Sequence, residues 1–172
     1  MPRLHYLAYG SNLHPLRLAA RVPSARFLDV IEMPGRTLAF HKRSDDGSGK
    51  CLFYTEQGEE QMMYGALFDF DPVDKGQLDK AEGLGQGYEE KLVHFSHKGT
   101  TYTPYAYTVQ HTHIDATLIP YDWYKRFVLA GARHHKLPTK YVQMIEAVVA
   151  KADPRPERAL KNLRLAEQLE QA

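Results

Sequence analysis

Short strand-like segments follow one another along the first two thirds of this chain, and this succession constrains the fold more than any other feature. They alternate apolar with polar residues or are rich in β-branched and aromatic residues, as half-buried strands are. The segments are Leu4–Tyr9, Phe27–Met33, Thr37–Lys42, Cys51–Thr55, Met62–Asp69, Tyr88–Ser96 and Thr101–Val109. Strands that succeed one another in this way favour an antiparallel or mixed sheet, or a small barrel, over a Rossmann-type fold.

Helical patterns occupy most of the remaining chain, so the sequence predicts an α+β fold. We expect helices over 13–20, 71–83, 121–135, 139–151 and 157–171. Pro104 indicates an edge position or a bulge in the last strand segment. A length of 172 residues suits one domain, 1–172, with 153–172 as a C-terminal helical tail. Leucines in this tail can pack on the domain itself or on a second copy, which makes a homodimer one expected assembly.

The charge balance argues against several classes of partner. The chain has 22 basic and 21 acidic residues, a formal charge of +1, so we expect no binding to nucleic acid or to an anionic membrane. No apolar stretch approaches the roughly 18 residues that span a bilayer, and the N-terminus lacks the apolar core of a signal peptide. We therefore expect a cytoplasmic protein. Cys51 is the only cysteine, and its strand-like surroundings indicate a small core residue rather than a nucleophile.

The first strand segment ends in a short polar turn, Gly10-Ser11-Asn12, and a helical pattern begins directly after it. Ser11 or Asn12 is available as the N-cap of that helix. The amides of such a turn form a plausible cradle for an anion or an oxyanion. Strand–turn–helix corners occur in most mixed folds, so the turn alone indicates no function.

Glu82 is the carboxylate with the most informative position. It lies in the last turn of the helix predicted to start at Asp71, just before the glycine-rich stretch Gly83–Gly87. The carboxyl end of a helix dipole is negative, so a charged carboxylate there is disfavoured, and partial burial adds to this effect. A carboxylate whose charged form is disfavoured in this way is suited to general acid–base catalysis. The alternative interpretation is an ordinary exposed glutamate, and Glu89 and Glu90 are further acidic residues nearby.

Other motifs fit established sites poorly. The histidine pairs His111/His113 and His134/His135 lack the spacing of a zinc site, so we expect no metal. Ser11 is not part of a G-x-S-x-G motif, which argues against a serine nucleophile. The loop Ser44–Lys50 resembles a hairpin turn more than a calcium or phosphate site.

Three motifs follow one another along the chain: YLAYGSNL at Tyr6–Leu13, LDKAEG at Leu78–Gly83 and YKRFVLAGARHHKLP at Tyr124–Pro138. Taken together, they resemble the γ-glutamylcyclotransferase family, including its avirulence-induced-gene-like relatives. The similarity runs in order from about Leu4 to Ile145. The resemblance implies a small mixed or antiparallel β-barrel surrounded by helices.

The resemblance also implies a set of site residues. Glu82 matches the general acid/base of the family. Tyr9, Gly10, Ser11 and Asn12 match the loop that receives the γ-glutamyl group, with Leu13 completing the motif. Tyr124 matches a substrate-contacting tyrosine of the vertebrate enzyme, and Tyr88 and Tyr107 fall where other cavity tyrosines lie.

The reaction implied is the cyclisation of a γ-glutamyl amino acid or amine to 5-oxoproline with release of the amine, without metal or cofactor. The segments Lys42–Cys51 and Gly83–Tyr88 depart from the vertebrate enzyme, which leaves the identity of the released amine open. Two alternatives remain: a non-catalytic binding module for an acidic or γ-glutamyl metabolite, and an enzyme that removes a γ-glutamyl group in a dedicated biosynthetic pathway.

Overall fold

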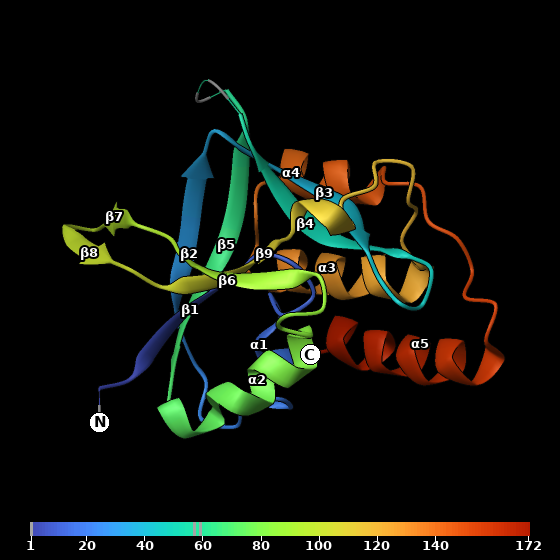
Figure 1. Ribbon diagram of the computed structural model, residues 1–172, viewed down its shortest axis with the longest axis horizontal. Coiled ribbons are helices and arrows are strands. Elements are labelled where there is room, and N and C mark those ends of the chain that lie inside the picture. The colour runs from blue at the N-terminus through green and yellow to red at the C-terminus, as the bar shows by residue number, and fades with distance from the viewer. Residues whose placement is uncertain (1, 57, 59) are drawn as a thin grey trace.

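The computed structural model describes residues 2–56, 58 and 60–172 of the chain (Figure 1). Strands dominate the first two thirds and helices the last third, as the sequence predicts. The elements are β1 (Leu4–Ala8), α1 (Pro15–Ala19), β2 (Arg26–Pro34), β3 (Arg36–Arg43), β4 (Gly49–Thr55), β5 (Met62–Phe70), the 3₁₀ turn η1 (Pro72–Asp74), α2 (Lys75–Glu82), β6 (Tyr88–Leu92), β7 (Phe95–His97), β8 (Thr100–Tyr102), β9 (Tyr105–Val109), the 3₁₀ turn η2 (His111–His113), α3 (Asp122–His134), α4 (Thr139–Glu146) and α5 (Pro156–Glu170).

The main sheet has five strands in the order β2-β5-β1-β9-β6. Its neighbours are antiparallel except for β1 and β9, which run parallel. β3 pairs with β4, and β7 with β8, in separate two-stranded sheets. The predicted α+β class is confirmed. Closure of the sheet into a barrel is not observed: in the described residues, β2 and β6 remain the two edges of the main sheet, because no ladder joins them.

Two predicted strands are each interrupted, and Pro104 explains where. The segment expected over 88–96 divides into β6 and β7, and the segment over 101–109 divides into β8 and β9. Pro104 lies between β8 and β9, where its carbonyl accepts a hydrogen bond from Val93 N at 2.9 Å. Since proline has no N–H to give to a ladder, the pairing breaks at this point. The predicted edge position is therefore wrong, because β9 lies inside the sheet.

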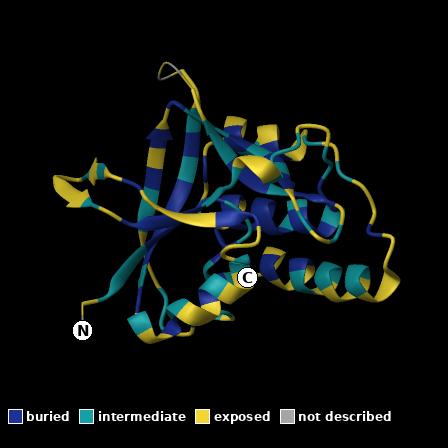
Figure 2. Ribbon diagram, viewed as in Figure 1, coloured by how far each residue is buried: buried dark blue, intermediate teal, exposed yellow. Residues whose placement is uncertain are grey.

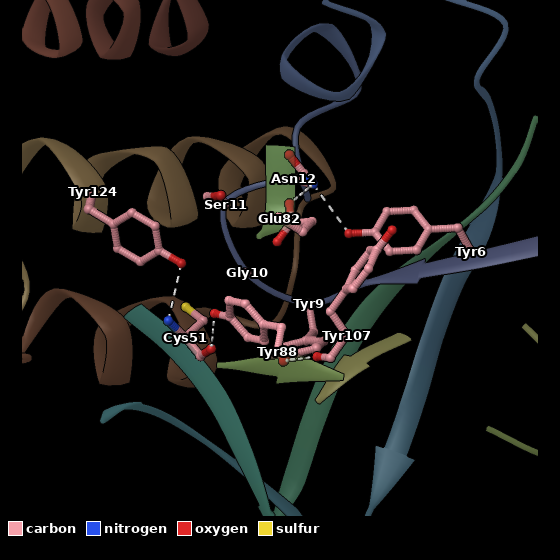
Figure 3. Close-up of a pocket in the computed structure, with 10 residues that line it drawn as sticks. All are labelled: Tyr6, Tyr9, Gly10, Ser11, Asn12, Cys51, Glu82, Tyr88, Tyr107 and Tyr124. Atoms are coloured by element: carbon pink, nitrogen blue, oxygen red, sulfur yellow. Dashed lines mark hydrogen bonds between the residues drawn. The ribbon is translucent and has the colours of Figure 1, made fainter. Parts of the chain in front are cut away.

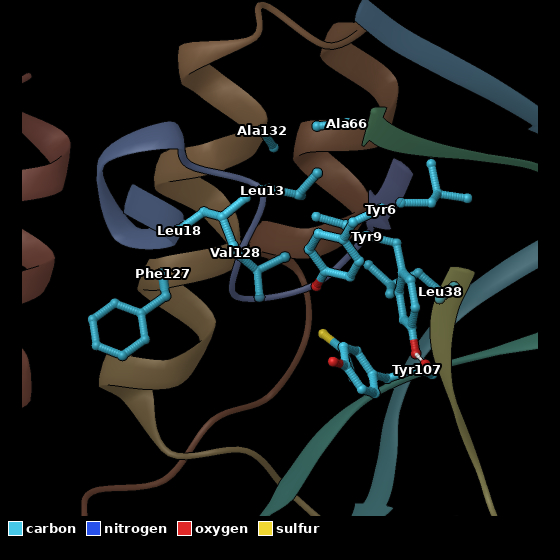
Figure 4. Packing of buried hydrophobic residues seen from close by; sticks show 14 of the residues in the cluster. Tyr6, Tyr9, Leu13, Leu18, Leu38, Ala66, Tyr107, Phe127, Val128 and Ala132 are labelled. Atoms are coloured by element: carbon cyan, nitrogen blue, oxygen red, sulfur yellow. Dashed lines mark hydrogen bonds between the residues drawn. The ribbon is translucent and has the colours of Figure 1, made fainter. Parts of the chain in front are cut away.

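The core lies between the sheet strands and α3. Figure 2 shows α3 as a deeply buried helix, and Figure 4 shows Phe127 and Val128 of α3 near Leu13 and Leu18. Gly131 allows this approach, because a Cβ added there would lie 2.4 Å from Leu13 Cβ. The chain that follows β1 is thus held directly against α3.

The C-terminal stretch forms α5, which packs along α3 (Figure 1). Arg126 on α3 donates two hydrogen bonds to Glu170, at 2.8 and 2.6 Å. Ala166 and Leu169 are buried, whereas Leu160 is 52% exposed. The predicted leucine stripe therefore faces its own domain only in part, and pairing of two copies through α5 stays a prediction. Among the described residues, no helix is long and apolar enough to cross a membrane.

Candidate active site

Three successive residues of the turn after β1, Gly10, Ser11 and Asn12, line a pocket. Leu13 N donates to Gly10 O at 3.1 Å and closes the turn. The amides of Gly10, Ser11 and Asn12 donate no hydrogen bond to the described part of the chain. Successive amides without partners form a concave donor site that suits an anion.

Gly10 is required where this turn meets β4. A Cβ added to Gly10 would lie 2.9 Å from Cys51 Cβ and 3.2 Å from Cys51 Sγ. Real Cβ atoms do not approach this closely without a shift of the backbone. The glycine therefore lets the turn lie against Cys51, which is itself 2% exposed.

The helix after the turn is capped differently from our expectation. Its N-cap is His14, whose Nδ1 accepts a hydrogen bond from Leu16 N at 3.2 Å. Burial, with His134 and His135 nearby, lowers the pKa of His14 to about 4, so the ring stays a neutral acceptor. Ser11 and Asn12 are not used as caps, which leaves both side chains at the pocket.

Glu82 ends α2, as the sequence predicts. Asp71 caps the preceding 3₁₀ turn through Val73 N at 3.0 Å, and Gly83 ends the helix at a φ of +70°. A left-handed residue at this place is the common helix stop, and glycine adopts it without strain. The Glu82 side chain is only 16% exposed.

Asn12 and Arg21 hold one oxygen of Glu82. Asn12 Nδ2 donates to Glu82 Oε1 at 2.5 Å, and Arg21 Nη1 donates to the same oxygen at 3.1 Å. Arg21 also donates to Asn12 Oδ1 at 3.0 Å, and Asn12 Nδ2 contacts Tyr6 Oη at 3.2 Å. Glu82 Oε2 accepts no hydrogen bond from the residues that the structure describes. One oxygen is thus fixed and the other is available to a ligand.

Tyrosines and Cys51 complete the inner pocket, which encloses about 290 Å³ including its open mouth (Figure 3). Its lining consists of Tyr6, Tyr9, Gly10, Ser11, Asn12, Cys51, Glu82, Tyr88, Tyr107 and Tyr124. Among these described residues, Glu82 is the only carboxylate.

The tyrosine hydroxyls are largely engaged with the protein itself. Tyr88 Oη donates to Cys51 O at 2.7 Å, and Cys51 N donates to Tyr124 Oη at 3.1 Å. Tyr9 Oη donates to Tyr107 O at 2.5 Å. Burial raises the pKa of Tyr9, Tyr88 and Tyr124 well above the ordinary value, so their side chains remain neutral phenols.

The structure brings together all the predicted site residues except Leu13. Leu13 is fully buried in the core, next to α3, and does not line the pocket. Its place in the sequence motif reflects packing, since the turn directs it away from Ser11 and Asn12 into the core.

Three residues of the site, Tyr6, Arg21 and Cys51, were not predicted from the sequence. Tyr6 lies on β1 and begins the YLAYGSNL motif, but no role in the site was assigned to it. Arg21 follows Arg17 by four residues, a spacing that places both on one side of a helical stretch near the turn. Cys51 is a buried residue, as predicted, but it also lines the pocket. Burial raises the pKa of its thiol to about 12, which keeps it protonated.

The histidine pairs take no part in this pocket. The described residues contain no group of three or more histidine, cysteine, aspartate or glutamate side chains placed to hold a metal ion.

Comparisons with known proteins point to one family. Residues 62–145 match the model of the AIG2-like family. The human γ-glutamylcyclotransferase is 27% identical over 152 residues, which cover 83% of this chain and 77% of the relative. The bovine γ-glutamylcyclotransferase is 27% identical over 150 residues, with the same coverage.

Solved structures share the fold. A human protein described as uncharacterised superposes with a TM-score of 0.81 at 22% identity, covering 97% of this chain and 99% of its own. A structure described as a γ-glutamyl cyclotransferase gives a TM-score of 0.80 at 21% identity, with the same coverage. The chain is thus similar to the γ-glutamylcyclotransferases over most of its length and to the AIG2-like family over residues 62–145.

Proposed function

We propose that this protein is a γ-glutamylcyclotransferase that converts a γ-glutamyl amino acid or amine to 5-oxoproline. The α-amine of the γ-glutamyl group attacks its own γ-carbonyl carbon, and a five-membered ring closes. The bond from this carbon to the leaving nitrogen then breaks, so that 5-oxoproline and a free amine are the products. The relatives named γ-glutamylcyclotransferase support this reaction class.

Glu82 is the proposed general acid/base. The substrate ammonium must lose a proton before it attacks, and the leaving nitrogen must gain one before it departs. Glu82 Oε2 can accept the first proton and donate the second, while Oε1 stays fixed by Asn12 and Arg21. Proton transfer of this kind contributes roughly 10²–10⁴-fold to a rate.

The amides of Gly10, Ser11 and Asn12 are proposed to bind the γ-glutamyl part. As the carbonyl becomes tetrahedral, its oxygen gains negative charge, and backbone donors that are already in place stabilise that charge. The alternative role for these amides is to hold the substrate α-carboxylate. Holding the amine against the carbonyl also accelerates the reaction, because the intramolecular attack then starts from a defined geometry.

The observation that carries the proposal is that Glu82 and these three free amides line one pocket. A hydrolase with Ser11 as nucleophile fits less well. Ser11 lines the pocket, yet no histidine is among the described residues that line it. A hydrolase would also release glutamate in place of 5-oxoproline.

The test is to incubate the protein with a panel of γ-glutamyl amino acids and amines and to measure 5-oxoproline and glutamate by mass spectrometry. Glu82→Gln is expected to abolish 5-oxoproline formation while the melting temperature stays close to that of the wild type. Glu89→Gln is the matched control, because Glu89 is exposed and lies outside the pocket. Full activity of Glu82→Gln would refute the role of Glu82.

The same panel separates the alternatives. Binding of a γ-glutamyl compound without turnover would identify a binding module. Turnover of a single γ-glutamyl amine, with the others inert, would indicate an enzyme of a dedicated pathway. Ser11→Ala should reduce cyclisation only in part, whereas a serine hydrolase would lose all activity.

A further inference from the structure

A second, outer pocket opens beside the inner one. Ser11, Glu82, Tyr88 and Tyr124 line both pockets, so the two adjoin at Glu82. The outer pocket encloses about 700 Å³ including its open mouth, more than twice the space of the inner one. A group that leaves the inner pocket past Glu82 therefore enters this space.

Basic side chains dominate the outer pocket. Its described lining includes the cations Arg17, Arg21, Lys42 and Lys50, and the carboxylates Asp46 and Glu82. Arg21 pairs with Glu82 at 3.1 Å, and Lys50 pairs with Asp46 at 2.7 Å. No carboxylate of the described chain lies within 4 Å of the charged groups of Lys42 or Arg17. In this part of the structure, two positive charges therefore remain without an ion-pair partner.

The side chain of Lys42 is largely buried, and its ammonium has no ion-pair or hydrogen-bond partner in the described part of the chain. The residue is 7% exposed, and the ammonium lies 4.6 Å from the centre of the Tyr88 ring. It makes no hydrogen bond to the described residues, and Asp45, Asp46 and Glu82 act on it only from beyond ion-pair distance. Burial lowers the pKa of Lys42. A largely buried lysine that lines a pocket without an anionic partner points to an anionic ligand in that pocket.

Arg17 is a second cation of the outer pocket without an ion-pair partner among the described residues. Its guanidinium lies 3.9 Å from the centre of the Phe127 ring, and its Nε is buried without a hydrogen-bond partner in the described chain. Burial, followed by the neighbouring Arg21, lowers the pKa of Arg17. A guanidinium nevertheless keeps its charge in proteins. A buried donor left unpaired is uncommon and calls for a partner.

We infer that the outer pocket binds the leaving group of the substrate and selects one that carries two negative charges, with Lys42 and Arg17 as its cationic partners. The inference rests on the proposed cyclisation, which requires the leaving nitrogen to stay within reach of Glu82. The γ-glutamyl part itself is assigned above to the amides of Gly10–Asn12 in the inner pocket, so these cations remain for the leaving group. A dicarboxylic amino acid and a phosphate monoester of an amino alcohol both have the required charge.

The test compares four substrates that differ in leaving-group charge: γ-glutamyl-ethylamide, γ-glutamyl-alanine, γ-glutamyl-aspartate and γ-glutamyl-phosphoethanolamine. With 5-oxoproline as the readout, kcat/KM at low salt is expected to rise by about tenfold or more from the neutral leaving group to either dianionic one. The last two substrates distinguish a dicarboxylate from a phosphate. Equal or lower kcat/KM for both dianionic substrates would overturn the inference and leave the cyclisation intact.

Variants assign the effect to its residues. Lys42→Met and Arg17→Met keep the apolar stem, and each should reduce kcat/KM for the preferred dianionic substrate about tenfold and for γ-glutamyl-ethylamide much less. Lys91→Met, an exposed position on β6, is the matched control. Calorimetric binding of the same four compounds to Glu82→Gln measures the charge preference without turnover. If Glu82→Gln binds the dianionic compounds more tightly but the wild type forms no 5-oxoproline, the cyclisation alone is refuted. If Glu82→Gln shows no preference for the dianionic compounds, the inference about the outer pocket is refuted.

Discussion

Asn12 Nδ2 lies 2.5 Å from Glu82 Oε1, and this hydrogen bond joins the turn after β1 to the end of α2 across 70 residues. It fixes one oxygen of the carboxylate beside the turn that carries the three free amides. Asn12 is 2% exposed, and together with Arg21 it sets the position of this carboxylate in the inner pocket.

Replacing this donor with an acceptor should disrupt the pocket. Asn12→Asp keeps the shape but sets a carboxylate against Glu82, and like charges at this distance repel. We expect kcat/KM for 5-oxoproline formation to fall by about 10²-fold or more. Tyr6→Phe removes only the 3.2 Å contact between Tyr6 Oη and Asn12 Nδ2, so it should lower kcat/KM less than about tenfold. Near-normal activity of Asn12→Asp would contradict the positioning role.

Arg21 should matter for activity more than for stability. Its ion pair with Glu82 is partly exposed, at 26% and 16%, and such pairs contribute up to about 1 kcal/mol to stability. Arg21→Met should therefore lower kcat about 10–100-fold with a small change in melting temperature. Arg3→Met is the matched control, because the Arg3–Asp69 pair has similar exposure, 28% and 17%, outside the pocket. Equal loss of activity in both variants would show a general structural effect instead.

The order of strands and helices could be predicted from the sequence, because hydrophobic periodicity and turn residues are local signals. Asp71 and Gly83 illustrate this, since the cap and the stop of the α2 region lie where they were expected. Closure of a barrel could not be tested by such signals, because it depends on a ladder between β2 and β6, which are distant in sequence.

The resemblance identified most of the pocket, including Tyr88 and Tyr107, which lie outside its three motifs. Glu82 and the Gly10–Asn12 turn could be identified, whereas Arg21 required a contact over 61 residues that no local pattern reveals. Leu13 shows the opposite error: it belongs to the motif, but the turn points it into the core. The place of Glu82 at a helix end was likewise an incomplete signal, since it does not reveal the donors Asn12 and Arg21.

Two glycines should respond in opposite directions to alanine. A Cβ at Gly131 would lie 2.4 Å from Leu13 Cβ and 2.8 Å from His14 N, so Gly131→Ala should destabilise the fold by roughly 1–3 kcal/mol and disturb the adjoining turn. Gly76 in α2 has nothing within 4 Å of its added Cβ, so Gly76→Ala should stabilise by about 0.5–1 kcal/mol. Urea unfolding measures both. A stable, active Gly131→Ala would mean that α3 moves away from Leu13 at little cost.

Asp153 should make the attachment of α5 sensitive to acid. Its carboxylate accepts hydrogen bonds from Arg158 at 2.6 and 2.7 Å and from Trp123 Nε1 at 2.9 Å, and its side chain is fully buried. The hydrogen bonds from Arg158, together with those from Arg155 N and Trp123, hold the pKa of Asp153 well below its usual value of about 3.8. A depressed folded-state pKa stabilises the protein fully above that usual value, and the contribution is lost as the pH falls below it.

Asp153→Asn should therefore destabilise the protein by about 1–3 kcal/mol at pH 7, because the uncharged amide cannot accept all of these hydrogen bonds. The difference from the wild type should shrink as the pH falls below about 4, where the wild-type carboxylate begins to lose its advantage over the amide. Urea midpoints at about pH 7, 5 and 3 measure this, with Asp45→Asn as the control, since Asp45 is exposed. A penalty for Asp153→Asn that is equal at all of these pH values would show that shape, and not charge, makes Asp153 necessary for the packing of α5 on α3.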